Sequence, residues 1–182
     1  MSRAHSIVGY KPDERPENDF YPTPPHMTQA LLRVEKFKGP IWECACGDGA
    51  ISRVLEENGY SVISTDIEPR GYGTQRDFLW LGESLAPNIG TNPPFKLLNE
   101  FIEKATSLNP EKIFLLAKLA ALETIERSHI LERTKLTRVW IFRERQTMWR
   151  NGIAESENGG MIPFCWLIWE RGYRGKPEIG WI

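Results

Sequence analysis

Hydrophobic residues follow two patterns along the chain, short continuous runs and longer segments with apolar positions every three or four residues. The short runs predict buried strands, namely IWECA (41–45), SVISTD (61–66), NIGT (88–91), KIFLLAK (112–118), TRVWIFR (137–143) and FCWLIWE (164–170). The periodic segments predict helices over residues 23–37, 50–60, 96–108 and 119–133. Short strands that alternate with helices indicate a parallel sheet with helices on both faces.

The last two predicted strands have no helix between them. A polar segment with several glycines, about residues 144–162, separates them. Consecutive strands without a crossover helix usually pair antiparallel. We therefore predict an α/β, doubly wound and mostly parallel sheet with an antiparallel last strand. In such sheets ligands bind beyond the carboxyl ends of the strands, where the strand order reverses.

Size and composition are those of an ordinary globular domain. The chain has 182 residues, of which 41% are hydrophobic and 26% charged. We expect residues 1–18 to form a flexible arm and residues 19–182 to form one catalytic domain. No apolar run approaches the roughly 18 residues of a membrane span. We therefore expect a cytoplasmic protein without a membrane partner.

Charge and cysteine content narrow the expected partners. A net charge of −1 does not suit a broadly basic nucleic-acid clamp, so any contact with nucleic acid requires a local patch. Cys44, Cys46 and Cys165 suggest no disulfide framework, and Cys44-x-Cys46 lacks the second pair of a zinc site. We expect the cysteines to pack and the site to hold no metal.

Glycines and acids follow the first two predicted strands. Gly47 and Gly49 flank Asp48 at a strand-to-helix turn, where bare backbone can approach a ligand. Asp66 ends the second strand, 19 residues beyond Gly47, which is the spacing of a carboxylate that binds a ribose. Alone, the glycines could form a tight turn and Asp66 could be a helix cap. Together they predict a nucleoside-containing cofactor.

The segment GTNPPF (90–95) ends the next strand with an amide, two prolines and an aromatic ring. The side-chain carbonyl of Asn92 and the backbone carbonyl of Pro93 are acceptors suited to an NH₂ group. Accepting both hydrogens would draw the nitrogen lone pair out of conjugation, and Phe95 offers a flat face for a planar ring. A simpler alternative is an asparagine cap with prolines that begin a helix.

These motifs, in this order, resemble the N6-adenine DNA methyltransferases of phages and prophages, a branch of the class I S-adenosylmethionine-dependent methyltransferases. The resemblance covers about residues 19–171. Its motifs are DFYPTP (19–24), ECACGDG (43–49), Asp66, Asp77-Phe78, NPPF (92–95) and FCWLIWERG (164–172). Asp48 departs from the threonine common at that place. The resemblance implies a seven-stranded Rossmann-like sheet and S-adenosylmethionine as cofactor.

The resemblance also implies roles for individual residues. The catalytic tetrapeptide would be Asn92, Pro93, Pro94 and Phe95. The cofactor would be bound by Tyr21, Thr23, Glu43, Cys44, Ala45, Gly47, Gly49, Asp66, Ile67, Asp77, Phe78 and Asn92. Substrate contacts are expected from Phe95, Lys118, Arg145, Trp149 and Arg150. Segment 144–162 is a possible DNA-contacting loop, and it could equally be an ordinary polar loop. Lys118 could equally be a solvated strand end.

The expected reaction is methylation of the N6 amino group of adenine in duplex DNA, with the base flipped out of the helix. The same tetrapeptide also suits an adenine in RNA or a glutamine amide in a protein. A third alternative is an inactive cofactor-binding subunit of a larger assembly, although an intact NPPF segment argues against it. Because the chain shows no separate target-recognition domain, a partner or a homodimer could supply specificity, in a bacterial or phage-infected cell.

Overall fold

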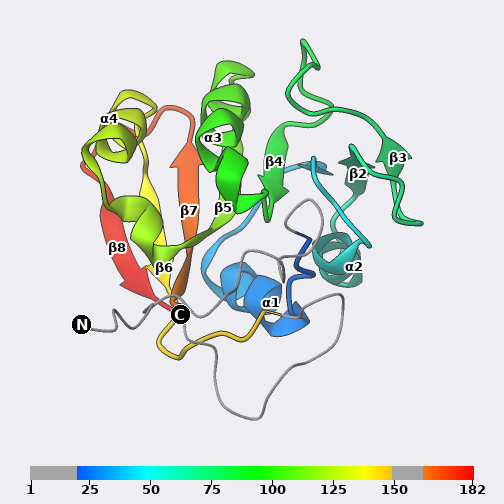
Figure 1. The fold of residues 1–182 in the computed structure, drawn as a ribbon, viewed down its shortest axis with the longest axis horizontal. Coiled ribbons are helices and arrows are strands. Elements are labelled where there is room, and N and C mark those ends of the chain that lie inside the picture. The colour runs from blue at the N-terminus through cyan, green and yellow to red at the C-terminus, as the bar shows by residue number, and fades with distance from the viewer. Residues whose placement is uncertain (1–19, 149–161) are drawn as a thin grey trace, which may run out of the picture.

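The computed structural model describes residues 20–148 and 162–182, and these residues build one twisted sheet with helices against it (Figure 1). The expected arm, residues 1–18, lies outside the described residues. The strands run in the order β3-β2-β1-β4-β5-β7-β6-β8 across the sheet. Their bounds are β1 Ile41–Glu43, β2 Val62–Asp66, β3 Thr74–Gln75, β4 Asn88–Thr91, β5 Lys112–Lys118, β6 Arg138–Ile141, β7 Phe164–Glu170 and β8 Glu178–Trp181.

Strand directions confirm the predicted fold class. Neighbouring strands pair parallel except where β7 is involved, and β7 pairs antiparallel with both β5 and β6. The sheet differs from the seven strands implied by the resemblance because the described residues contain eight. Two strands were not predicted from the sequence, namely the two-residue β3 and β8, a short edge strand with mostly exposed residues. In β8, Gly180 lies against Trp140, since a Cβ at Gly180 would be 2.0 Å from the indole ring.

The helices begin near the predicted positions and are shorter than predicted. They are α1 Pro25–Val34, α2 Ala50–Glu57, α3 Leu98–Ser107 and α4 Ile125–Arg133, with 3₁₀ turns η3 Phe95–Leu97 and η4 Leu119–Leu122. The single helix expected over residues 119–133 is divided because Thr124, at φ 79°, caps α4 and accepts a hydrogen bond from the Arg127 backbone N–H. None of the helices within the described ranges is long and apolar enough to span a bilayer.

The two faces of the sheet carry separate hydrophobic clusters because side chains along a strand alternate in direction. In β5, Ile113 and Leu115 join the cluster that includes α3 and α4, whereas Phe114 joins the cluster that includes α1 and α2. Gly90 in β4 is closely covered by Phe114, because a Cβ at Gly90 would lie 1.9 Å from the phenyl ring. This close packing against Phe114 of β5 fixes the position of β4, and with it the start of the tetrapeptide that follows β4.

A buried ion cluster joins the end of α1 to the sheet. Glu35, the C-cap of α1, is only 3% exposed. Its carboxylate accepts hydrogen bonds from Lys112 Nζ at 2.7 Å, Arg138 Nε at 2.7 Å and Trp140 Nε1 at 2.9 Å. Arg138 also pairs with Glu170. Lys112 begins β5 and Arg138 begins β6, so the cluster lies at the edge of the sheet opposite the carboxyl ends of those strands.

Candidate active site

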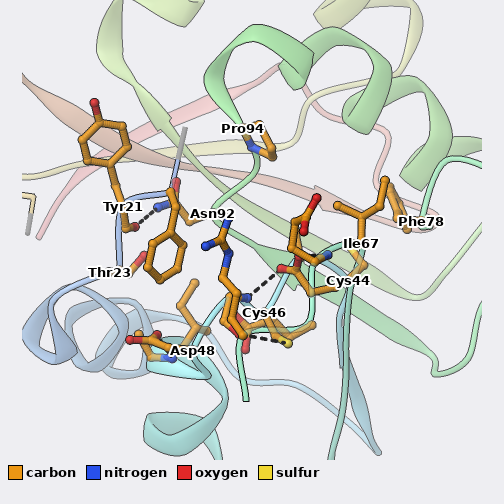
Figure 2. A pocket seen from close by; sticks show the side chains of 18 of the residues that line it. Tyr21, Thr23, Cys44, Cys46, Asp48, Ile67, Phe78, Asn92 and Pro94 are labelled. Carbon is orange, nitrogen blue, oxygen red and sulfur yellow. Dashed lines mark hydrogen bonds between the residues drawn. The ribbon is translucent and has the colours of Figure 1, made fainter. Parts of the chain in front are cut away.

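A cavity opens at the carboxyl ends of β1, β2 and β4, the edge where the topology predicts a ligand (Figure 2). Four segments that are distant in sequence form its walls. They are residues 20–23 before α1, the β1–α2 turn, residues 66–70 after β2, and residues 77–79. Asn92 and Pro94 close the cavity on the β4 side. The predicted cofactor residues line it with one exception, Gly49.

The glycine turn explains that exception. Gly47 has φ 55° and Gly49 has φ 85°, and both values favour glycine. Gly47 lines the cavity, whereas a Cβ at Gly49 would lie 2.5 Å from the Tyr72 ring. Gly49 is also the N-cap of α2. The structure thus corrects the expectation that Gly49 lies on the cavity wall, since helix geometry and the packing of Tyr72 account for this glycine.

Asp66 joins the first two strands at the cavity. Its Oδ2 accepts a hydrogen bond from the Gly47 N–H at 2.7 Å, and its Oδ1 accepts one from the Glu68 N–H at 2.9 Å. A carboxylate oxygen can accept a second hydrogen bond, so both oxygens still have capacity for ligand hydroxyls. Asp66 therefore fixes the glycine turn and presents acceptors to the cavity, as a ribose-binding acid would.

Two hydrophobic side chains form the wall opposite Tyr21 and Thr23, as Figure 2 shows. Ile67 is 56% exposed, which leaves an aliphatic surface for a planar ligand. Phe78 is 2% exposed, and its ring packs edge-on against Trp42 with centroids 5.2 Å apart. Phe78 therefore supports the core as well as the cavity. Asp77 Oδ1 accepts the Leu79 N–H at 2.9 Å, which fixes this loop.

Asn92 lies at the mouth of the cavity with its amide oriented by main chain. Its Nδ2 donates a hydrogen bond to the Tyr21 carbonyl at 3.0 Å (Figure 2). Its Oδ1 is buried and accepts no hydrogen bond from any residue that the structure describes. A buried acceptor without a partner is costly, so such atoms often mark a ligand position. The Tyr21 bond sets which end of the Asn92 amide faces that position.

The two prolines differ in their relation to the cavity and to the helix that follows. Pro94 lines the cavity and precedes η3, which continues into α3. Pro93 is buried and does not line the cavity. The prolines therefore do precede a helical turn, as the simpler alternative expected. Asn92 does not cap it, because the N-cap of η3 is Pro94 and the Asn92 Oδ1 has no partner among the described residues.

Phe95 lies outside the cavity lining, among aromatic rings and a cation. Its centroid is 5.9 Å from that of Tyr21 and 6.0 Å from that of Phe164. Lys118 Nζ lies 4.2 Å from the Phe95 ring centroid, so the end of β5 faces the tetrapeptide and not only solvent. Arg145 is exposed. Trp149 and Arg150 lie outside the described residues, so their substrate contacts remain predictions.

Glu43 ends β1 at the floor of the cavity and is 2% exposed. Burial raises the pKa of its carboxyl to about 8, and the neighbouring Asp66 and Asp48 contribute, although hydrogen bonding from Ser52 opposes the shift. The Ser52 hydroxyl donates to Glu43 and lies 2.7 Å from Ser64 Oγ. Much of the population therefore carries a proton on Glu43 near neutral pH.

The Glu43→Gln variant should become more stable relative to wild type as the pH rises from 5 to 8. The folded-state pKa of about 8 exceeds the ordinary 4.5, so the wild type loses stability as the pH rises through this window. We expect the difference in unfolding free energy between the two proteins to change by about 3 kcal/mol. Urea unfolding at both pH values measures it. Glu57→Gln, at an exposed position on the same helix as Ser52, is the control, and an equal change in both variants would refute this role of Glu43.

The cysteines fit the packing role expected from the sequence. Burial raises the pKa of the Cys46 thiol to about 12 and that of the Cys44 thiol well above its ordinary value, with Glu43 contributing to both. Both thiols line the cavity in their neutral form. In the described ranges no group of three or more His, Cys, Asp or Glu residues could hold a metal ion.

Several lining residues were not expected from the sequence. Phe20 and Arg70 are the most informative, and the others include Pro22, Asp48, Glu68, Leu97 and Phe101. Phe20 lies within the DFYPTP segment beside Tyr21, and Arg70 follows Asp66 by four residues in the same loop. The sequence places Phe20 and Arg70 close to predicted site residues, which was the available signal. The conformation of their loops decides whether such side chains point into the cavity, and the sequence does not show it.

Solved structures with similar folds agree with this arrangement, whereas no protein-family profile and no curated protein matches the sequence. A Pyrococcus horikoshii protein, provisionally described as an RNA methyltransferase, has a TM-score of 0.61 at 15% identity, covering 89% of this chain and 92% of that one. A SAM-dependent methyltransferase from Archaeoglobus fulgidus has 0.55 at 13% identity, covering 81% and 92%. The chain has the class I methyltransferase fold.

A third similar structure is much longer than this chain. It comes from Vibrio vulnificus YJ016 and is provisionally described as the modification subunit of a type I restriction enzyme. Its TM-score is 0.57 at 13% identity, and the alignment covers 90% of this chain and 47% of the other. At such identities the likeness concerns the fold, and it confirms the Rossmann-like class predicted from the sequence.

Proposed function

We propose that this protein is an S-adenosylmethionine-dependent methyltransferase that modifies the N6 amino group of adenine in DNA. The observation that carries the proposal is the Oδ1 of Asn92 at the mouth of the cavity, which is buried and has no partner among the residues that the structure describes. An acceptor in this place suits an amino group that must be held beside a bound cofactor. The fold supports the same chemistry, since the similar structures include a SAM-dependent methyltransferase.

The lining residues fit the chemical parts of this cofactor. The carboxylate of Asp66 would accept ribose hydroxyls, and the exposed face of Ile67 would cover the adenine with Phe78 beside it. Gly47 and the buried Thr23 would border the methionine end. When bound, the cofactor supplies an electrophilic methyl group on a sulfonium, so the protein needs chiefly to align and desolvate the acceptor nitrogen.

The tetrapeptide would align that nitrogen. Asn92 Oδ1 and the Pro93 carbonyl would accept the two hydrogens of the target NH₂ group. This geometry would turn the nitrogen lone pair toward the cavity, where the methyl donor would lie. The N–C bond would form as the S–C bond of the cofactor breaks, leaving S-adenosylhomocysteine, and the methylated nitrogen would release one proton to solvent. Phe95 would stack on the base, and Lys118, already at the Phe95 ring, would face the same substrate. The base must leave the DNA stack to reach this position.

DNA is favoured over the alternatives by the resemblance of the whole set of motifs, from DFYPTP to FCWLIWERG. Among similar structures, one is described as an RNA enzyme and another as part of a restriction system. Intact Asn92 and Phe95 speak for an active enzyme and against a purely structural subunit. Target specificity would come from segment 144–162, from a partner or from a second copy of the chain.

The test is transfer of tritiated methyl from S-adenosylmethionine to unmethylated duplex DNA, single-stranded RNA and a glutamine-containing peptide. We expect label in DNA, recovered as N6-methyladenine after digestion to nucleosides. The matched control is a duplex in which hypoxanthine, which lacks the amino group, replaces adenine. Label in RNA or peptide but not in DNA would overturn the DNA assignment, and label in the hypoxanthine duplex would overturn the assignment to the adenine amino group.

A further inference from the structure

Phe20, Gly47 and Arg70 form a stack at the cavity wall, brought together from three segments of the chain. A Cβ at Gly47 would lie 2.6 Å from Phe20 Cε2, so the phenyl ring packs closely on the bare backbone of the turn. The Arg70 guanidinium carbon lies 4.2 Å from the centroid of the Phe20 ring. All three residues line the cavity. A cation–π contact of this kind holds the guanidinium in place.

The charges around this stack are unbalanced. Arg70 is the one lysine or arginine in the cavity lining, as far as the structure describes the chain. Besides Glu43, which carries a proton in much of the population near neutral pH, four carboxyl side chains line the same cavity, those of Asp48, Asp66, Glu68 and Asp77. The acids suit the positive sulfonium and ammonium groups of the proposed cofactor. They would repel its one negative group, the carboxylate of the amino-acid end, unless a cation neutralised that group.

The geometry of Arg70 leaves its hydrogen-bond donors available for such a group. A guanidinium stacks through its face and donates in its plane, so the Phe20 contact does not use the N–H groups. The Arg70 side chain donates no hydrogen bond to another residue within the described ranges. The paired N–H groups of arginine match the two oxygens of a carboxylate, and such bidentate pairs are strong and directional.

We infer that Arg70 binds the carboxylate of the methionyl end of the cofactor, and that Phe20 positions Arg70 for this contact. The inference rests on the cofactor part of the proposed function and is independent of the substrate. It makes Arg70 the residue that distinguishes an intact amino-acid end from one without a carboxylate. Phe20 then acts through Arg70, as a positioning residue between the glycine turn and the loop after β2.

Calorimetric titration without DNA tests this inference. The probes are S-adenosylhomocysteine and its decarboxylated analogue, which keeps the nucleoside, the sulfur and the amine. We expect Arg70→Ala to weaken S-adenosylhomocysteine binding by about 10- to 100-fold, the range for hydrogen bonds between charged groups. The variant should leave the affinity for the decarboxylated analogue within about twofold, because the lost contact does not exist there.

Three further variants test which feature of Arg70 makes the contact and whether Phe20 positions it. Arg70→Lys keeps the charge but not the paired donors, so it should recover part of the affinity. Phe20→Leu should weaken S-adenosylhomocysteine more than the decarboxylated analogue. Arg76→Ala, at an exposed position outside the cavity lining, is the control and should bind both probes as wild type does. Thermal unfolding of each variant establishes that it is folded.

The outcomes separate this inference from the proposed function. Equal losses for both probes in Arg70→Ala, or no loss for either, would overturn the carboxylate contact and leave the proposed cofactor intact. Failure of the folded wild type to bind S-adenosylhomocysteine would overturn the proposed cofactor and this inference together. A loss confined to the carboxylate-bearing probe supports both.

Discussion

Replacing Asn92 by alanine should reduce the rate of methyl transfer by about 10²- to 10³-fold, the loss typical when one preorganised hydrogen-bonding group at a reaction centre is removed. The variant keeps the other cofactor-lining residues, so the affinity for S-adenosylhomocysteine should fall by much less than the transfer rate. The reason is geometric, because Asn92 Oδ1 is the buried acceptor that would hold the target NH₂ group. Single-turnover transfer of tritiated methyl, with saturating cofactor, measures the effect.

The chain offers a matched control for this variant in Asn99. This asparagine also has a buried Oδ1 without a partner among the described residues, and its Nδ2 donates to Glu126 at 3.3 Å. Asn99 is in α3 and does not line the cavity. Asn99→Ala should therefore change the transfer rate by less than about twofold. A similar loss in both variants would mean that Asn92 acts through folding and not through the reaction.

Replacing Glu35 by alanine should lower the free energy of unfolding by about 3–5 kcal/mol, the range for a buried ion pair that loses one partner. The variant leaves Lys112, Arg138 and the Trp140 N–H without the acceptor that they share. Urea unfolding at pH 7 measures the loss. Glu103→Ala is the control, because its ion pair with Arg133 is exposed and should contribute less than about 1 kcal/mol.

Acid should reduce the difference between the Glu35→Ala variant and wild type. Burial acts to raise the pKa of Glu35, but the hydrogen bonds from Arg138, Lys112 and Trp140 outweigh it, and the pKa lies below its ordinary 4.5. The stabilisation is therefore present above pH 4.5 and is lost as the pH falls through the folded-state pKa. A difference that stayed constant on acidification would contradict the ionic role of Glu35.

The fold was predictable where apolar runs were long enough to be read as strands. β5 and β7 are seven residues each and were predicted from their hydrophobic runs. β3 has two residues and β8 is largely exposed, so neither leaves a hydrophobic signature. The break between η4 and α4 depends on the left-handed backbone at Thr124, which is rare for threonine and has no sequence signal of its own.

The site, like the fold, was predictable only where the sequence carries a clear signal. Residues placed directly at strand ends, such as Asp66 and Asn92, line the cavity because topology brings strand ends to one edge, and their roles stay predictions. Phe20 and Arg70 were missed because their inward position depends on how two loops fold over the turn. Gly49 was misplaced because a glycine needed by a helix start looks the same in sequence as a glycine needed by a ligand.

The hydrogen bond between the Asn92 amide and the Tyr21 carbonyl has a consequence for how the site could vary. The acceptor belongs to the main chain, so this contact places no demand on the side chain at position 21. It does place a demand on the direction of the carbonyl, and Pro22 restricts the backbone of the residue before it to extended conformations. Pro22 therefore helps to orient the Asn92 amide by fixing the direction of the Tyr21 carbonyl, although the proline ring itself makes no hydrogen bond.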